Sequence, residues 1–359
     1  MHYSIIGAMS GSSLDGLDLA LCHFDEKDGH LTWSLEHGET ISFPENIQDA
    51  LRLAHTISGS KLMELDAVFG KFIGEEIQKW SNANDVTADC IASHGHTVFH
   101  EPSKSFTTQI GSGAHIAFAT GIDTITNFRT ADVAAGGQGA PFAPVADKDL
   151  FPGYQAYLNL GGIVNASGIT SIGKWKGWDI GPCNQALNHL AIKLGHPYDY
   201  AGQIASQGKV IRSVLDSLVT MFPYNEAQPK GLSNAEVKNT WIKFLDARTE
   251  SVIDLLATTT EAIAFLILNH LQIISGQSSK ILVTGGGAHN LFLMKRLEVL
   301  GENKKLTFEL PESTIIDYKE CLLMGYLGFL TLQGKPYGIH QMTGASADSI
   351  GGAMHKAHK

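Results

Sequence analysis

Apolar and polar residues follow one another in the same order twice along this chain. Each half opens with three extended apolar segments broken by glycine-rich turns and continues with alternating amphipathic helices and short apolar strands. In the first half we expect strands near 3–9, 17–24, 31–40, 90–93 and 124–126, and helices near 61–81 and 114–119. In the second half we expect strands near 154–160, just after 162, and near 174–178, 280–284 and 306–310, with helices within 184–275 and near 291–299 and 318–332. This order predicts two similar α/β domains, 1–150 and 151–359, on either side of a cleft.

Composition narrows the class of protein. The 359 residues are 43% hydrophobic and 17% charged, which is enough to bury two cores. The formal net charge of −10, with no cluster of lysine and arginine, argues against a nucleic-acid partner. Four scattered cysteines indicate reduced thiols in a cytoplasmic protein. The most apolar helix, Ile263–Ile274, contains Asn269, His270 and Gln272, so we expect a buried helix and no membrane span.

Three glycine-rich turns follow predicted strands. The first, Gly11–Gly16, suits phosphate oxygens, and its carboxylates Asp15 and Asp18 suggest a Mg²⁺ ion, although a plain hairpin is the alternative. The second turn contains Asn159, Gly161 and Gly162 at the equivalent place in the second half. The third, Gly285–Gly287 followed by Asn290, opens a helix and is either a tight connection or the adenosine end of an ATP site.

Asp179 follows the third strand of the second half, just before Gly181-Pro182. It either caps the helix that comes next or acts as a general base on an attacking water or hydroxyl. Between the two halves, the glycines of 136–139 favour a binding loop, a hinge or both.

Polar residues after short strands of the first half are candidate substrate contacts. His94, His96 and His100 either bind a metal or hydrogen-bond a polar substrate. Gln109, Arg129 and Asp132 are typical of contacts with sugar hydroxyls or a carboxylate, and Arg129 suits a carboxylate best. Glu320 heads a late helix and lies either on the surface or in the cleft.

These motifs together resemble the anhydro-N-acetylmuramic acid kinases, a family of the actin-like sugar-kinase superfamily. The resemblance is carried by the segments 7–18, 93–97, 109–111, 127–132, 135–141, 159–163 and 179–182, and it runs from residue 5 to beyond 330. His96 departs from the family pattern, which commonly has glutamine there. The implied fold is a duplicated actin-like, ribonuclease-H-like kinase fold with two domains around a nucleotide cleft.

The resemblance implies that ATP and water convert 1,6-anhydro-N-acetylmuramic acid to N-acetylmuramic acid 6-phosphate and ADP in peptidoglycan recycling. Asp179 is then the base that activates water. The expected ATP contacts are Gly11, Ser12, Ser13, Leu14, Asp15, Gly16, Leu17, Asp18, Asn159, Gly161, Gly162, Gly285, Gly286, Gly287 and Asn290, with Mg²⁺ at Asp15 and Asp18. The expected sugar contacts are His94, Gln109, Arg129, Asp132 and Glu320.

Three alternatives stay open: a kinase of another sugar or acid in the same superfamily, a non-catalytic ATP-binding member, and a metal hydrolase built on the histidines. The expected partners are the sugar and ATP, and a homodimer is compatible with the sequence.

Overall fold

The computed structural model divides the chain into two compact units. The structure describes residues 1–11, 14, 16–169, 173, 175–222, 232–275 and 279–358. The first unit consists of Met1–Pro152 and Tyr318–Lys359, and the second of Gly153–Asp317. The second unit is therefore one continuous stretch of sequence inserted between the two parts of the first.

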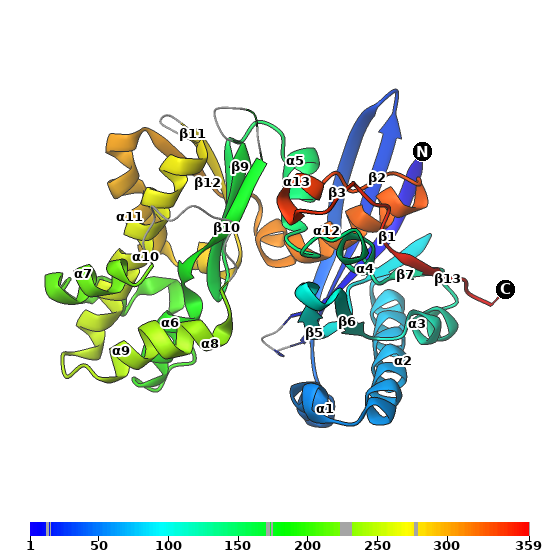
Figure 1. Cartoon of the computed structure of the whole chain (residues 1–359), viewed down its shortest axis with the longest axis horizontal. Helices are drawn as coiled ribbons and strands as arrows, with labels where there is room; N and C mark the ends of the chain where they lie inside the picture. Colours follow the sequence, from blue (N-terminus) through cyan, green and yellow to red (C-terminus); the bar gives the residue numbers. More distant parts are fainter. Residues whose placement is uncertain are drawn as a thin grey trace. The chain divides into compact units, whose positions relative to one another are not determined.

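The first unit contains a six-stranded mixed sheet (Figure 1). Its strands are β1 (His2–Ser10), β2 (Gly16–Lys27), β3 (His30–Ser42), β4 (Cys90–Ser93), β7 (Thr124–Thr126) and β13 (Ala353–His355), in the spatial order β13-β7-β4-β1-β2-β3. The first three strands form an antiparallel meander, whereas β4 lies parallel to β1 and β7 lies parallel to β4. A separate hairpin, β5 (His96–Glu101) and β6 (Phe106–Ile110), was not predicted from the hydrophobic pattern.

Helices cover both faces of this sheet. The helices that lie wholly or mostly in this unit are α1 (Glu45–Leu53), α2 (Gly59–Asn84), α3 (Gly113–Thr120), α4 (Thr130–Ala134), α5 (Ala143–Leu150), α12 (Ser313–Leu332) and α13 (His340–Thr343). On one face, α2 buries Phe69, Ile73 and Ile77 at helical spacing against Ile6 and Leu19 of the sheet. Because both faces are covered, the middle of β1 (residues 5–9) and of β2 (residues 19–22) is a continuous apolar run, as expected of buried strands.

On the other face, α12 lies unusually close to the strands. A Cβ atom at Gly7 of β1 would lie 2.0 Å from the carbonyl oxygen of Cys321. A Cβ at Gly328 of α12 would lie 2.9 Å from the Cβ of Ala92. The absence of side chains at these positions is therefore what allows the helix to pack directly on the sheet.

The predicted domain division is wrong at its C-terminal end. Its boundary at 150 lies close to the observed one, but residues 318–359, predicted in the second domain, belong to the first unit. The reason is the packing of α12 on β1 and the pairing of β13 with β7, where Ala353 lies opposite Thr126. The predicted helix at 318–332 also begins earlier, at Ser313, and Tyr318 interrupts it with φ −117° and ψ 21° at the unit boundary.

The second unit repeats the strand order of the first. Its strands are β8 (Ala156–Leu160), β9 (Ile163–Ile169), β10 (Trp175–Pro182), β11 (Ser279–Thr284) and β12 (Leu306–Glu309), in the spatial order β10-β9-β8-β11-β12. Here too an antiparallel meander is extended by two parallel strands. The predicted duplicated, ribonuclease-H-like α/β fold is thus confirmed by the matching order and direction of five strands in each unit.

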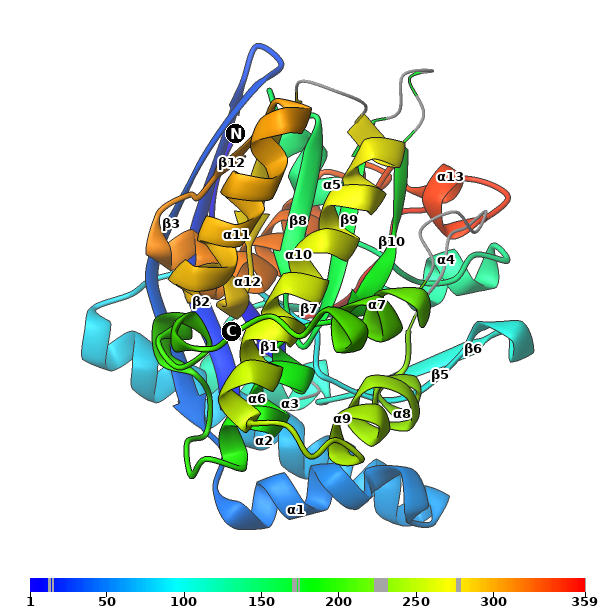
Figure 2. The ribbon, with the colours of Figure 1, turned by 90° about the vertical axis from the view of Figure 1, so that its left-hand side faces the viewer.

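The helices of the second unit are α6 (Asn184–Ile192), α7 (Arg212–Thr220), α8 (Asn234–Val237), α9 (Lys243–Asp246), α10 (Val252–Ser275) and α11 (Leu291–Gly301), with a π-helical turn at Lys238–Ile242. Figure 2 shows α10 running along the sheet with α11 beside it. Within the described residues, Val252–Gln272 is the one helical stretch long and apolar enough to cross a membrane, and 67% of it is buried inside the protein. Such burial is typical of a core helix, as the sequence predicted.

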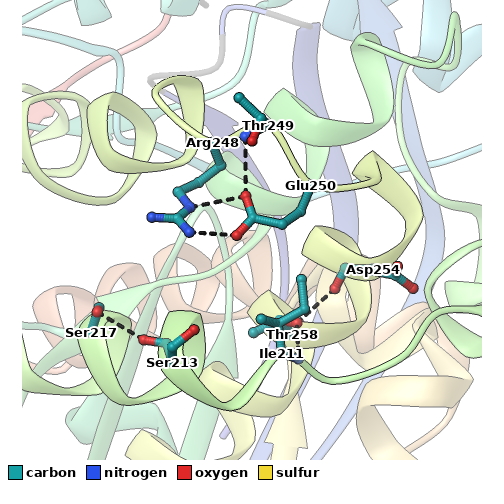
Figure 3. A network of polar contacts seen from close by, with 8 residues as sticks. All are labelled: Ile211, Ser213, Ser217, Arg248, Thr249, Glu250, Asp254 and Thr258. Atoms are coloured by element: carbon teal, nitrogen blue, oxygen red, sulfur yellow. Dashed lines mark hydrogen bonds and ion pairs between the residues drawn. The ribbon is translucent and has the colours of Figure 1, made fainter.

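Hydrogen bonds fix the start of α10 to residues 209–211, which lie just before α7 (Figure 3). The buried Thr258 hydroxyl accepts the Ile211 N–H at 2.9 Å and donates to the Asp254 carbonyl at 2.7 Å. The carboxylate of Asp254 accepts the Lys209 N–H at 2.7 Å, and Arg248 pairs with Glu250 just before the helix. These contacts are structural, since they satisfy backbone groups that the loop would otherwise leave unpaired.

A buried histidine makes stability depend on pH. The Trp178 indole N–H donates to Nδ1 of His270 at 2.6 Å, and His270 is 7% exposed. Burial lowers the pKa of His270 from 6.5 to about 4. Between these values the unfolded chain binds the proton and the folded chain does not, so stability falls as pH falls from 6.5 to 4, by about 1.4 kcal/mol per unit of pKa difference.

We expect His270→Gln to reduce this loss, because glutamine accepts the Trp178 hydrogen bond and does not titrate. Urea unfolding at pH 7 and at pH 4.5 measures it. An equal pH dependence in the wild type and the variant would contradict the assignment to His270.

Candidate functional site

The first glycine-rich turn joins β1 to β2. The predicted ATP contacts Ser12, Ser13 and Asp15 lie outside the described residues. The Leu14 N–H donates to the Gly11 carbonyl at 3.4 Å, and Leu14 has a positive φ of 58°.

The residues after this turn have different environments. A Cβ at Gly16 would lie 2.6 Å from the Ile41 carbonyl oxygen, so this glycine is required by the pairing with β3. Leu17 is 1% exposed and packs in the core, which leaves only its backbone for a ligand. Asp18 is half-buried, and its Oδ1 accepts the Thr40 hydroxyl at 2.6 Å.

The second glycine-rich turn, between β8 and β9, is held against the start of α6. The Gly161 carbonyl accepts the Asn184 N–H at 3.2 Å, and the Gly162 carbonyl accepts the Cys183 N–H at 2.9 Å. Asn159, at the end of β8, is half-buried. The turn is thus rigidly placed at the strand ends.

The third turn packs on the second. A Cβ at Gly285 would lie 2.3 Å from Oδ1 of Asn159, and a Cβ at Gly287 would lie 2.7 Å from the Cβ of Leu160. These two glycines are required by packing. A Cβ at Gly286 would meet no atom of the described residues within 4 Å, so this glycine alone of the three faces open space.

Asn290, the last predicted contact of this turn, caps α11. Its side-chain oxygen accepts the Leu293 N–H at 3.0 Å, and the residue is 8% exposed. Only its amide nitrogen remains for a nucleotide.

Asp179 lies close to the second turn in the sheet. In the register of the sheet, Asp179 lies opposite Asn165 of β9, and Asn165 lies opposite Asn159 at the end of β8. A β-bulge follows Asp179, which is a common way to redirect a side chain at a functional site. The alternative that Asp179 caps the next helix is wrong, since α6 has Cys183 as its N-cap and no side-chain cap. Pro182 is the last residue of β10.

The carboxylate of Asp179 is suited to accept a proton. Its Oδ2 accepts the Leu232 N–H at 2.7 Å, and no described residue donates to its Oδ1. Burial raises the pKa of Asp179. The Leu232 hydrogen bond lowers this pKa in part, and repulsion from Glu236 raises it further. A carboxylate with a raised pKa and one unused oxygen is a stronger base than an exposed aspartate. The Leu232 N–H was not predicted, because a backbone donor 53 residues away leaves no signal in sequence.

In the first unit, three of the predicted sugar contacts have polar atoms left for a ligand. Arg129 is half-buried; burial lowers its pKa to about 10, while Glu320 favours the charged form, so it stays a cation at neutral pH. Glu320 is exposed to solvent, while crowding of its carboxyl group by protein atoms, and next repulsion from Asp18, raise its pKa. Gln109 donates to the Thr107 hydroxyl at 2.8 Å, and its buried Oε1 has no donor among the described residues.

The other two predicted sugar contacts, His94 and Asp132, are occupied by the protein. His94 is 5% exposed, and its two ring nitrogens contact the Gly95 carbonyl and Arg129. Asp132 is 3% exposed, and its two oxygens accept the Gly139 N–H and the Thr343 hydroxyl. The structure therefore does not support direct sugar contacts for these two residues.

The metal-hydrolase alternative is not supported either. No group of three His, Cys, Asp or Glu residues able to hold a metal occurs in the described part of the chain. Both nitrogens of His94 are used, and Nδ1 of His96 lies 3.3 Å from the Ser10 hydroxyl at the end of β1. His100 contacts the Thr107 hydroxyl at 3.0 Å.

Two α/β units with the same strand order, glycine turns at the strand ends and a half-buried carboxylate near one turn define a protein of the duplicated actin-like class. The chain belongs to the anhydro-N-acetylmuramic acid kinase family, whose model matches residues 3–357. An anhydro-N-acetylmuramic acid kinase of Pseudomonas syringae pv. syringae is 32% identical over 370 residues, which cover 99% of this chain and 100% of the relative. One from a Synechocystis species is 32% identical over 381 residues, covering 98% of each chain.

Solved structures resemble the chain more distantly. The activator of the 2-hydroxyisocaproyl-CoA dehydratase from Clostridium difficile has a TM-score of 0.40 and 12% identity, over 92% of this chain and 97% of its own. The hexokinase from Schistosoma mansoni has a TM-score of 0.37 and 9% identity, over 90% of this chain and 85% of its own.

Proposed function

We propose that this protein is an ATP-dependent kinase that converts 1,6-anhydro-N-acetylmuramic acid and water to N-acetylmuramic acid 6-phosphate, with release of ADP. Membership of the family across residues 3–357 supports this reaction. Its role is then the recycling of cell-wall sugars. The structural observation that carries the proposal is Asp179, a half-buried carboxylate with a raised pKa and an unused oxygen near the second glycine turn.

In this reaction Asp179 takes a proton from a water molecule that attacks the anomeric carbon. The bond between that carbon and the bridging oxygen breaks, and the departing C6 oxygen takes the γ-phosphoryl group of ATP. One base is sufficient, because the departing oxygen is captured by phosphorus and needs no proton. Phosphoryl transfer itself depends mainly on positioning and on donors that stabilise negative charge.

The residues with free polar groups in the first unit are proposed to bind the sugar. The Arg129 guanidinium suits the lactyl carboxylate, which distinguishes muramic acid from glucosamine. The unused Oε1 of Gln109 suits a hydroxyl or amide N–H of the sugar. Glu320, whose pKa is raised by desolvation and next by repulsion from Asp18, suits a sugar hydroxyl.

The remaining glycine-turn residues are proposed to contact ATP, with Gly286 the most exposed of the third turn. Asp18 is proposed to lie near Mg²⁺, because carboxylate oxygens suit this ion. The negative charge of Asp18 also contributes to the raised pKa of Glu320, so two carboxyl groups lie in the same region. A bound Mg²⁺ would neutralise phosphate charge during transfer. We further propose a cytoplasmic location; a homodimer stays a hypothesis that light scattering tests.

A substrate panel tests the function. Purified protein with ATP and Mg²⁺ is given the anhydro sugar, N-acetylmuramic acid or N-acetylglucosamine, and ADP release is measured. We expect kcat/KM to be highest for the anhydro sugar. A clear preference for another sugar would favour a kinase with a different sugar substrate. If none of the three sugars leads to ADP release, the non-catalytic ATP-binding alternative would be favoured.

A further inference from the structure

The Arg129 guanidinium is held on three sides by protein groups. Its Nε donates to Nε2 of His94 at 2.9 Å, and its Nη1 donates to the Gly139 carbonyl at 2.7 Å. The guanidinium carbon lies 5.4 Å from the centre of the Phe142 ring, within the range of a cation–π contact. Of its five N–H bonds, three have no acceptor among the described residues.

The contacts of His94 determine its tautomer. Since Nε2 accepts from Arg129, the ring proton lies on Nδ1, which donates to the Gly95 carbonyl at 3.0 Å. Gly95 has a φ of +71°, and a Cβ there would lie 2.3 Å from the Ile110 carbonyl oxygen, so its backbone is fixed. Burial, and next the charge of Arg129, lower the pKa of His94 to about 3. His94 is therefore a neutral acceptor at physiological pH.

The second contact of Arg129 is also fixed. The Gly139 N–H donates to Oδ2 of Asp132 at 2.7 Å, while its carbonyl accepts from Arg129. Oδ1 of Asp132 accepts the Thr343 hydroxyl at 2.7 Å, 211 residues away in the sequence. The Thr343 carbonyl in turn accepts the Gln138 N–H at 2.9 Å. These bonds favour a rigid loop over a hinge at residues 136–139.

We propose that His94 and the Gly139 peptide are positioning groups for Arg129. They orient its guanidinium so that its three free N–H bonds receive the substrate carboxylate. Asp132 and Thr343 act indirectly, by holding the Gly139 peptide in place. This inference rests on the proposed function. It assigns His94 no contact with the sugar and no proton transfer. The specificity for a carboxylate-bearing sugar then depends on residues that never touch it.

The test compares two variants of His94 on two substrates. His94→Leu removes the acceptor of the Arg129 Nε, whereas the amide oxygen of His94→Gln can replace it. KM and kcat are measured with 1,6-anhydro-N-acetylmuramic acid and with 1,6-anhydro-N-acetylglucosamine, which lacks the carboxylate. The surface variant His115→Gln is the matched control, and thermal unfolding reports whether each variant folds.

We expect His94→Leu to raise the KM for the carboxylate sugar by on the order of tenfold to a hundredfold, with the KM for ATP unchanged. The preference over the sugar without the carboxylate falls by a similar factor, and His94→Gln restores most of it. Thr343→Val, which replaces one hydroxyl by a methyl group, produces a smaller change in the same direction. If His94→Leu does not fold, Thr343→Val decides the question.

Three results would overturn the inference. The first is an unchanged KM in folded His94→Leu, and the second is an equal rise in KM for both sugars. The third is a His94→Gln variant whose KM is raised as much as that of His94→Leu, which would mean that the imidazole itself acts on the substrate. Sugar binding is also measured by calorimetry. A wild type that binds the carboxylate sugar but does not phosphorylate it contradicts the proposed function, while the binding data still test the role of His94.

Discussion

Asp179→Asn is expected to lower kcat by on the order of a hundredfold or more while the KM for ATP stays within a few-fold. The amide has nearly the same shape and still accepts the Leu232 N–H, but it cannot take a proton from water. Steady-state kinetics with the anhydro sugar measure both constants. In the wild type, the raised pKa of Asp179 predicts that kcat/KM falls on the acid side at a pH above the ordinary aspartate range.

Stability provides the control for this variant. Because burial raises the pKa of Asp179, the ionised carboxylate destabilises the fold at neutral pH, and Asp179→Asn should unfold at the same temperature or a higher one. Asp254→Asn is the matched comparison, since Asp254 accepts a backbone N–H at the same distance of 2.7 Å but has a structural role. We expect it to change stability and to leave kcat intact. Normal turnover by folded Asp179→Asn would contradict its assignment as the base.

Gly286→Val is expected to raise the KM for ATP by on the order of tenfold or more without unfolding the protein. Among the residues that the structure describes, none has an atom within 4 Å of a Cβ at Gly286, and the φ of Gly286 is not in the left-handed region, so the fold can accept the side chain. The valine would then occupy space that a nucleotide needs. Nucleotide titration measures the dissociation constant of ATP, and steady-state kinetics measure the KM for ATP.

Gly287→Val is the matched control for this experiment. Its side chain would collide with Leu160, where a Cβ would lie 2.7 Å from the leucine Cβ and 2.8 Å from its carbonyl oxygen, so we expect loss of stability. If Gly286→Val folds and binds ATP normally, the third turn is a structural connection and not part of the nucleotide site.

The duplicated fold was predictable because each strand and helix has a strong local pattern. The apolar stretches of β1 and β8 and the helical spacing of Phe69, Ile73 and Ile77 identify their elements without knowledge of tertiary contacts. The β5–β6 hairpin, in contrast, has half-exposed polar strands with no clear alternation, and it was missed. The short strand β13 is mostly exposed, so nothing in its composition assigns it to the first sheet.

Site residues were predictable from the sequence where a residue type and its place next to a strand indicate a role without knowledge of its partners. The glycine turns follow strands and Asp179 lies near the end of β10, which is where such groups gather in α/β proteins. His94 and Asp132 were assigned to the sugar because polar residues after strands look alike in sequence. Their actual partners, Arg129 and Thr343, are 35 and 211 residues away, and only the tertiary structure shows that these partners occupy them.

The mass of the product formed from 1,6-anhydro-N-acetylmuramic acid and ATP tests the central claim most directly. The account predicts a product heavier than the sugar by one water and one phosphoryl group, with one ADP formed for each molecule. A product heavier by a phosphoryl group alone would mean that the anhydro bridge survives and that a free hydroxyl was phosphorylated. That result, or ADP formation with an unaltered sugar, would contradict a kinase that opens the bridge with water activated by Asp179.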